Sequence, residues 1–141
     1  MTFRTSSEDE TIALGRRLGA SLPRRAAVLL IGQLGAGKTT LAKGIVEGLG
    51  TASPDDVSSP TFTLIHQYGE GVYHIDLYRL DTEAEIATLG LDEIFDRDAV
   101  VLIEWGERFP RLMPAERVEI RIQTEADDSR LVTVSGLPTC V

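Results

Sequence analysis

The sequence predicts an α/β fold, a three-layer sandwich around a mixed, mainly parallel central sheet that also carries antiparallel hairpins. Two continuous apolar runs, residues 26–31 and 99–105, are typical of central strands that are buried on both faces. Helical periodicity follows the first run, as in a strand-helix unit. Two pairs of alternating segments surround short turns and predict the hairpins.

The length indicates one domain over residues 1–141. Of these residues 43% are hydrophobic and 26% are charged, which suits a single core. The longest apolar stretch is far shorter than the roughly 20 residues that cross a bilayer, and the polar first ten residues do not resemble a signal peptide. We therefore expect a soluble, cytoplasmic protein without membrane contact. The single cysteine, Cys140, can form neither an intramolecular disulfide nor, alone, a zinc site.

The charge balance argues against direct binding of nucleic acid. The net charge is −8 and the sequence pI is near 4.7, whereas phosphate contacts require a basic surface. Four arginines cluster in the first part of the chain, at positions 16, 17, 24 and 25. Charge runs of this kind usually face water, so we expect a solvated surface.

The first third of the chain predicts helix, strand and helix. Ser7, followed three residues later by Glu10, resembles a capping box and starts a helix over about 8–22. The strand at 26–31 comes next. Apolar residues at helical spacing then predict a second helix over about 39–49.

The remaining two thirds predict two hairpins around one buried strand. Two β-prone runs surround the turn at 69–71, and Asp81 or Thr82 is placed to cap a short helix that ends near residue 89. A buried strand follows at 99–105. Alternating segments within 117–136, joined by an acidic turn, predict the second hairpin.

The turn after the first strand carries a phosphate-binding motif. Gly32, Gly37, Lys38 and Thr39 match G-x-x-x-x-G-K-[ST] between a predicted strand and a predicted helix. The glycines let backbone N–H groups point at phosphate oxygens, and the following helix adds its positive end. We expect Lys38, as an exposed loop side chain, to bridge the β- and γ-phosphates, and the Thr39 hydroxyl to ligate Mg²⁺. The expected nucleotide contacts are Gly32, Leu34, Gly35, Ala36, Gly37, Lys38, Thr39 and Thr40.

Two carboxylates are candidates for the metal and the attacking water. Asp76 lies at the end of one predicted strand and shares a face with His74. Glu104 ends the buried strand and lies beside the loop if that strand runs parallel to residues 28–31. An apolar strand that ends in an acid is typical of a second magnesium-anchoring motif. His74 is expected to be a hydrogen-bonded structural histidine rather than a proton carrier.

Several other residues have two interpretations each. Residues 58–63, with Thr61, are a hydroxyl-rich switch that reaches the nucleotide or a turn that leads into a strand. Arg79 either stabilises transition-state charge or pairs with a nearby acid. Tyr78 and Trp105 are most simply core or rim aromatics, although Trp105 is also placed to contact nucleotide because it follows the metal-binding acid.

Four segments together resemble one protein family. "GQLGAGKTT", "SPTFT", "HIDLYR" and "LIEW", in this order and spacing, resemble the TsaE (YjeE) family of bacterial P-loop ATPases over nearly the whole chain. The resemblance implies a P-loop NTPase-like fold with ATP and Mg²⁺ as cofactors. It also implies work with TsaD and TsaB in forming threonylcarbamoyladenosine next to the anticodon of tRNA. Contact with tRNA is then indirect, through the complex.

The resemblance also assigns roles to single residues. Thr39 and Glu104 resemble the magnesium ligands, and Asp76 resembles the catalytic carboxylate that works beside the loop lysine. Ser7 and Arg130 resemble residues at the edges of the nucleotide site. The chain departs from the family pattern at its short tail and at Gln33, where an acid or asparagine is common.

Two other nucleotide-binding classes share the loop. A small-molecule kinase would need an arginine-bearing lid, for which residues 107–111, "ERFPR", are the one candidate. A guanine-nucleotide switch normally reads its base through N-K-x-D, and this sequence contains no asparagine. Adenine is therefore favoured, with the kinase as the alternative to an ATPase.

Overall fold

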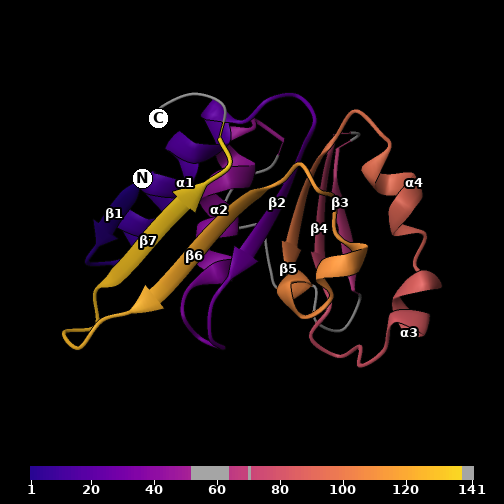
Figure 1. Cartoon of the computed structure of the whole chain (residues 1–141). Coiled ribbons are helices and arrows are strands. Elements are labelled where there is room, and N and C mark those ends of the chain that lie inside the picture. The colour runs from indigo at the N-terminus through magenta and orange to yellow at the C-terminus, as the bar shows by residue number, and fades with distance from the viewer. Residues whose placement is uncertain (52–63, 70, 138–141) are drawn as a thin grey trace.

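A computed structural model describes residues 1–51, 64–69 and 71–137 (Figure 1). In chain order the elements are β1 (Thr2–Thr5), α1 (Glu8–Ser21), β2 (Ala26–Ile31), α2 (Lys38–Gly48), β3 (Ile65–Tyr68), β4 (Val72–Asp76), α3 (Glu83–Ala87), α4 (Leu91–Phe95), β5 (Val100–Glu104), the 3₁₀ turns η2 (Gly106–Arg108) and η3 (Pro110–Leu112), β6 (Val118–Thr124) and β7 (Arg130–Ser135).

The strands of the described ranges form one mixed sheet in the order β1-β7-β6-β2-β5-β4-β3. Strands β6, β2, β5 and β4 run parallel to one another. Strand β3 at one edge, and β7 and β1 at the other, are antiparallel to their neighbours. This arrangement confirms the predicted fold class, with a parallel middle and both predicted hairpins.

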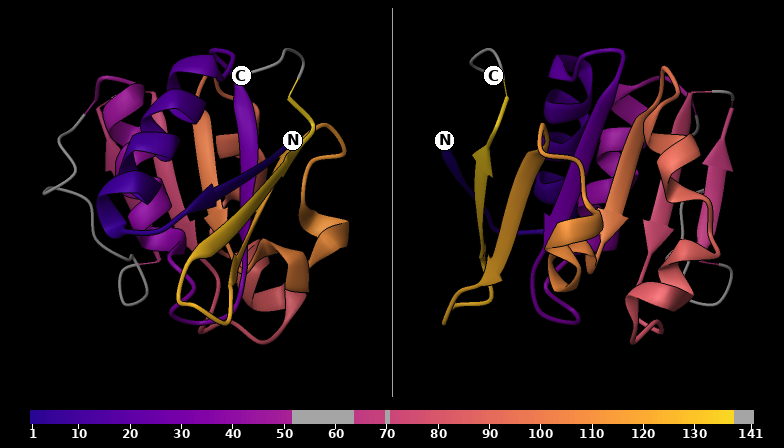
Figure 2. Two further views of the ribbon diagram at one scale, coloured as in Figure 1. Left: turned by 90° about the vertical axis from the view of Figure 1, so that its left-hand side faces the viewer. Right: turned by 45° about the vertical axis from the view of Figure 1, so that its right-hand side comes forward.

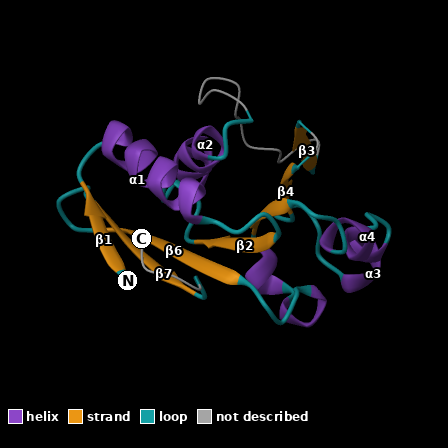
Figure 3. Cartoon of the chain, turned by 90° about the horizontal axis from the view of Figure 1, so that it is seen from above, coloured by secondary structure: helices purple, strands orange, loops and turns teal. Residues whose placement is uncertain are grey.

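Helices cover both faces of the sheet and give three layers. Along β2, Val28 and Leu30 belong to the core on one face, whereas Leu29 and Ile31 belong to the core on the other. Helices α1 and α2 cover the first face, and α3 and α4 cover the second (Figures 2 and 3). The strand is therefore apolar at every position because both of its faces are buried.

Helices α1 and α2 approach so closely that their backbones touch. A Cβ atom built on Gly44 would lie 2.1 Å from the carbonyl oxygen of Ile12, and one on Gly19 would lie 2.3 Å from that of Ile45. Gly15 and Gly48 are in similarly close contact with the opposite helix. Glycine is required here by the space between the helices, a constraint that the sequence analysis did not find.

The structure settles both predicted helix caps. Ser7 accepts from the backbone N–H of Glu10, as expected, but the Glu10 carboxylate accepts from Ser6 and not from Ser7. For α3, Thr82 is the cap rather than Asp81, and it forms a complete capping box with Glu85.

Besides the 3₁₀ turns η2 and η3, one short strand and one short helix were not predicted. Strand β1 pairs antiparallel with β7, so that Phe3 lies opposite Val132. Helix α4 has five residues and begins after Gly90, whose φ is +70°. Neither is long enough to show a hydrophobic period, and both form because the surrounding structure supplies a strand edge or an apolar surface.

Candidate functional site

The glycine loop and the two predicted acids meet at one edge of the sheet. The loop follows Ile31 at the end of β2, Asp76 ends β4 and Glu104 ends β5. Glu104 is paired in register with both Asp76 and Leu30. Parallel strands bring their carboxyl ends to the same edge, so residues far apart in the chain converge there.

The loop ends in backbone conformations that favour glycine. Gly35 has φ of +80° and Gly37 has φ of +108°, which other residues adopt only with strain. Gly37 precedes the first residue of α2, and no side chain of the described residues caps that helix. The first N–H groups of α2 therefore face the loop without a side-chain acceptor, an arrangement that favours an anion.

Lys38 is buried, contrary to the expectation of an exposed loop lysine. The residue is 4% exposed. The ammonium donates to the carbonyl oxygen of Gly32 at 2.8 Å and lies 3.5 Å from the centroid of the Trp105 ring. Burial lowers the pKa of Lys38, and the nearby carboxylates of Glu104, Glu107 and Asp76 oppose that shift.

A hydroxyl and a carboxylate lie together beside the loop. The Thr39 hydroxyl donates to Oε2 of Glu104 at 3.5 Å, and Nε2 of His74 lies 2.6 Å from the same oxygen. Asp76 is 2% exposed, and its Oδ1 accepts from the backbone N–H of Tyr78 at 2.8 Å.

These donors fit Mg²⁺ bound together with a nucleotide. Mg²⁺ prefers oxygen ligands, and at nucleotide sites it is held by one or two protein oxygens, phosphates and water. Thr39 and Glu104 supply such oxygens. No group of three or more His, Cys, Asp or Glu side chains suited to a metal occurs among the described residues. A metal here would thus depend on phosphate oxygens as further ligands.

Three cavities surround the loop. One of about 340 Å³ is lined by loop residues, including Leu34, together with Asp76, Tyr78, Glu104 and Trp105. A second, of about 170 Å³, is lined by Ser7, Glu8, Thr11, Gly35, Gly37, Thr40, Asp128 and Arg130. The third, of about 510 Å³, is lined by Gln33, Ala36, Glu107, Arg121 and neighbouring residues. Together the cavities contact the whole predicted loop.

Residues from the first and the last part of the chain line the second cavity together with the loop. Ser7 precedes α1 and Arg130 begins β7, yet both line this cavity together with Thr40. Nε of Arg130 donates to the carbonyl oxygen of Ala36 at 2.8 Å. The structure therefore places the two residues that were assigned only by resemblance next to the predicted phosphate loop.

Aromatic rings form one wall of the first cavity, which we call the acid-bearing cavity because Asp76 and Glu104 line it. The rings of Tyr78 and Trp105 have centroids 5.1 Å apart. Trp105 has φ of +68°, a strained value for a residue with a side chain. This backbone turn follows Glu104 directly and directs the indole over Lys38. Trp105 is thus the predicted rim aromatic, in contact with the loop lysine.

Glu107 is a residue of the site that sequence reasoning missed. It is partly buried, its Oε1 has no hydrogen-bond partner among the described residues, and burial raises its pKa. Its position next to the loop follows from the turn at Trp105. In the sequence it had drawn attention only as the first residue of a lid candidate.

The remaining candidates lie apart from this cluster or outside the described ranges. Residues 107–111 do not form a free lid, because Arg108 donates to the carbonyl oxygen of Tyr78 at 2.9 Å and Phe109 is buried. Arg79 is exposed on the turn after β4 and has a partner that leaves both of its interpretations open. Thr61 and the segment 58–63 lie outside the described residues.

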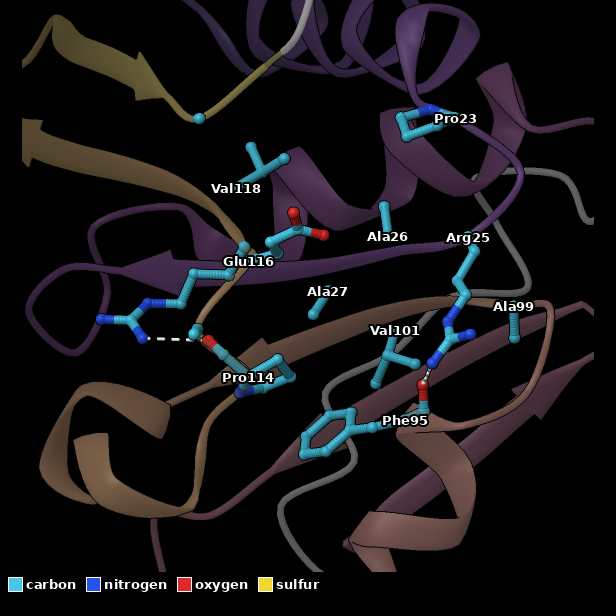
Figure 4. A pocket seen from close by; sticks show the side chains of 13 residues that line it. Pro23, Arg25, Ala26, Ala27, Phe95, Ala99, Val101, Pro114, Glu116 and Val118 are labelled. Atoms are coloured by element: carbon cyan, nitrogen blue, oxygen red, sulfur yellow. Dashed lines mark hydrogen bonds between the residues drawn. The ribbon is translucent and has the colours of Figure 1, made fainter.

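The largest cavity among those described, whose lining is drawn in Figure 4, lies at the amino ends of β2 and β6, whereas the glycine loop follows the carboxyl end of β2. It measures about 690 Å³ and is lined by the starts of β2 and β6 and by small or apolar residues. Its charged residues are partly engaged, since Arg25 donates to the carbonyl oxygen of Phe95 at 2.9 Å and Arg117 to that of Pro114 at 3.0 Å. The loop and its acids are at the other end, so size alone does not identify the site.

Comparisons with known proteins agree on one family. The model of the family "Threonylcarbamoyl adenosine biosynthesis protein TsaE" matches residues 5–132. The chain is 41% identical to the tRNA threonylcarbamoyladenosine biosynthesis protein TsaE of Bacillus subtilis over 140 residues, covering 97% of this chain and 86% of the relative. It is 40% identical to the protein of that name from Streptomyces coelicolor, covering 88% of each.

A solved structure is similar over nearly the whole chain. The crystal structure of YdiB from Bacillus subtilis superposes with a TM-score of 0.79 at 35% identity, covering 97% of this chain and 85% of the other. Within the described ranges, every helix is too short or too polar to cross a membrane.

Proposed function

Because this chain belongs to the TsaE family, we propose that it serves the threonylcarbamoyladenosine modification of tRNA as a single ATPase domain, residues 1–141, that uses Mg²⁺. The relatives carry that biosynthetic role in their names, and family membership supports nucleotide binding. ATP as the nucleotide, its hydrolysis and the dependence on Mg²⁺ are the finer parts of this proposal.

The convergence of loop and acids at one sheet edge is the observation that carries the proposal. The N–H groups at the start of α2 would bind phosphate oxygens, and Lys38 would exchange the carbonyl of Gly32 for the β- and γ-phosphates. Thr39 and Glu104 would hold Mg²⁺, which supplies positive charge next to the phosphates when bound. Asp76, at the neighbouring strand end, would orient the attacking water and accept its proton.

The kinase alternative is not favoured. A kinase would need a lid over the acceptor, and the one candidate segment is attached through Arg108 to the turn after β4.

The proposed partners are TsaD and TsaB. Family membership places the chain in the biosynthetic machinery, and its net charge of −8 disfavours direct binding of tRNA. We propose that tRNA is reached only through the complex, and that the partners raise a low intrinsic rate of hydrolysis.

Phosphate release from ATP, with and without Mg²⁺, tests the enzymatic part. The purified chain should release phosphate slowly without any acceptor, and removal of the metal should abolish release. Addition of a metabolite extract separates an ATPase from a kinase. Phosphoryl transfer to a metabolite, or turnover that does not respond to metal removal, would contradict the proposal.

A further inference from the structure

His74 occupies a position that packing alone does not explain. Its side chain is 0% exposed and lies on β4 in the layer that also buries Val72 and Leu102. One ring nitrogen, Nε2, lies 2.6 Å from Oε2 of Glu104. The other, Nδ1, is buried with no hydrogen-bond partner in residues 1–51, 64–69 and 71–137.

Leucine at this position would avoid the unpartnered Nδ1, but it would also remove the donor to Oε2 of Glu104, which is itself 3% exposed. A buried polar atom without a partner destabilises the folded state, whereas leucine at a core position does not carry that penalty. Of its two ring nitrogens, only Nε2 has a polar partner among the described residues, so the contribution of the imidazole lies in that contact. A carboxylate only accepts hydrogen bonds, so the contact requires the proton on Nε2.

The contact fixes one oxygen of the candidate metal ligand. Oε2 of Glu104 accepts from both His74 and Thr39, so its position is set from two sides. Glu104 also interacts electrostatically with Lys38, the cation needed for phosphate binding. Without His74, the carboxylate would be free to turn toward that ammonium.

We propose that His74 is a positioning residue that holds Glu104 in the orientation required to bind Mg²⁺. The inference rests on the proposed function of the site and adds a role beyond the structural one expected for this histidine. Groups that hydrogen-bond to a metal ligand orient it and strengthen metal binding, and their loss typically weakens metal affinity about 10- to 100-fold.

Binding of a fluorescent, non-hydrolysable ATP analogue during titration with Mg²⁺ tests the role without any turnover. His74→Gln keeps an N–H near the Nε2 position, whereas His74→Asn is polar but too short to reach Glu104. His74→Leu removes the donor. We expect the Mg²⁺ concentration for half-maximal binding to rise about 10- to 100-fold in the Asn and Leu variants and to stay within about 3-fold of wild type in the Gln variant.

His66 supplies the matched control, since it lies opposite His74 in the strand register. His66→Gln should leave the Mg²⁺ dependence unchanged. A double-mutant cycle adds a readout that a structural role would not change: in a Glu104→Gln background, His74→Asn should have no further effect on the Mg²⁺ requirement.

The outcomes separate the two hypotheses. If the wild-type protein binds the analogue equally well with and without Mg²⁺, the proposed metal site itself is refuted. If wild-type binding depends on Mg²⁺ and the Asn variant behaves like wild type, only the role of His74 is refuted. The Asn and Gln pair keeps this test decisive even if the Leu variant does not fold.

Discussion

At the scale of single residues, the structure buries one cationic side chain beside the glycine loop. Lys38 is almost fully buried, and its ammonium has a carbonyl and an indole ring as neighbours. A buried ammonium is poorly compensated by such neutral partners, and the nearby carboxylates of Glu104, Glu107 and Asp76 offset only part of the effect of burial, because the pKa of Lys38 remains lowered. The site thus keeps a desolvated cation next to the loop, where it would interact strongly with phosphate.

Replacement of Lys38 should therefore separate binding from stability. Lys38→Met removes the charge but keeps a side chain of similar length. We expect nucleotide binding to be lost and the protein to unfold at the same or a higher temperature. Calorimetric titration with ATP and thermal unfolding measure both. Lys43→Met, which changes the chain's other lysine, should leave nucleotide binding intact.

The lowered pKa of Lys38 also predicts a pH dependence. Between the pKa of Lys38 in the folded state and the ordinary value of 10.5, the unfolded chain binds more protons than the folded one. The free energy of unfolding of the wild type therefore increases with pH in this range. Any stability advantage of Lys38→Met is therefore largest below the folded pKa and narrows as pH approaches 10.5. Denaturation of both proteins across the alkaline range measures the difference. A difference independent of pH would contradict the assignment.

The two acids should separate metal binding from turnover. In Glu104→Gln, the Mg²⁺ concentration required for nucleotide binding should rise by at least about 10- to 100-fold, the effect expected when a group that only hydrogen-bonds to a metal ligand is lost. In Asp76→Asn, that requirement should stay unchanged while turnover falls about 10²- to 10⁴-fold, as expected for a lost general base. Mg²⁺ titrations and single-turnover hydrolysis provide the two readouts. Equal effects of both substitutions on metal binding would refute the division of roles.

At the scale of elements, the glycine-lined contact between α1 and α2 supports the site. Helix α2 begins at the phosphate loop, and α1 begins after Ser7 at the neighbouring cavity. Close packing of these helices determines how the two ends of the site meet. Because the contacts are backbone to backbone, no side-chain rotation can accommodate an added methyl group.

Gly44→Ala tests this helix contact. The new Cβ would lie 2.1 Å from the carbonyl oxygen of Ile12, so the helices must separate. The gain in helix propensity, about 1 kcal/mol, opposes an overpacking cost of about 1–3 kcal/mol, and we expect the cost to prevail with a net loss of up to about 2 kcal/mol. Chemical denaturation measures it. Gly71→Ala, where nothing lies within 4 Å, should change stability by less than about 0.5 kcal/mol.

At the scale of the whole molecule, the net charge of −8 disfavours direct binding of tRNA and favours action within a complex. Three of the four clustered arginines have partners: Arg16 pairs with Glu47, Arg17 lies over the ring of Phe3 and Arg25 pairs with Asp96. Two of the few exposed large apolar side chains of the described residues, Leu34 and Tyr78, line the acid-bearing cavity.

The corresponding prediction concerns the rate of hydrolysis. The isolated chain should hydrolyse ATP slowly, and TsaD with TsaB should accelerate it, because P-loop enzymes often receive a missing transition-state contact from a partner. Such a contact is worth about 10³–10⁵ in GTPases. Steady-state phosphate release at fixed salt, with the partners added singly and together with tRNA, measures the effect. A high rate without partners, or tight binding of tRNA by the chain alone, would contradict this view.

The sequence by itself determined the features that arise from local patterns. The glycine motif between strand and helix, the doubly buried strands and the two hairpins follow from hydrophobic period and turn chemistry, which act over a few residues. These patterns also placed Asp76 and Glu104 at strand ends. Short elements such as β1 and α4 lack such a pattern and depend on the rest of the fold.

Only the tertiary structure decided how distant residues combine. The register of β4 against β5 brings His74 to Glu104, and the packing of β7 beside the loop brings Arg130 to Ala36. Burial of Lys38 depends on the turn that places Trp105 over it. Pairwise contacts of this kind depend on strand register and helix packing between segments 30 to 94 residues apart, and no local pattern encodes them.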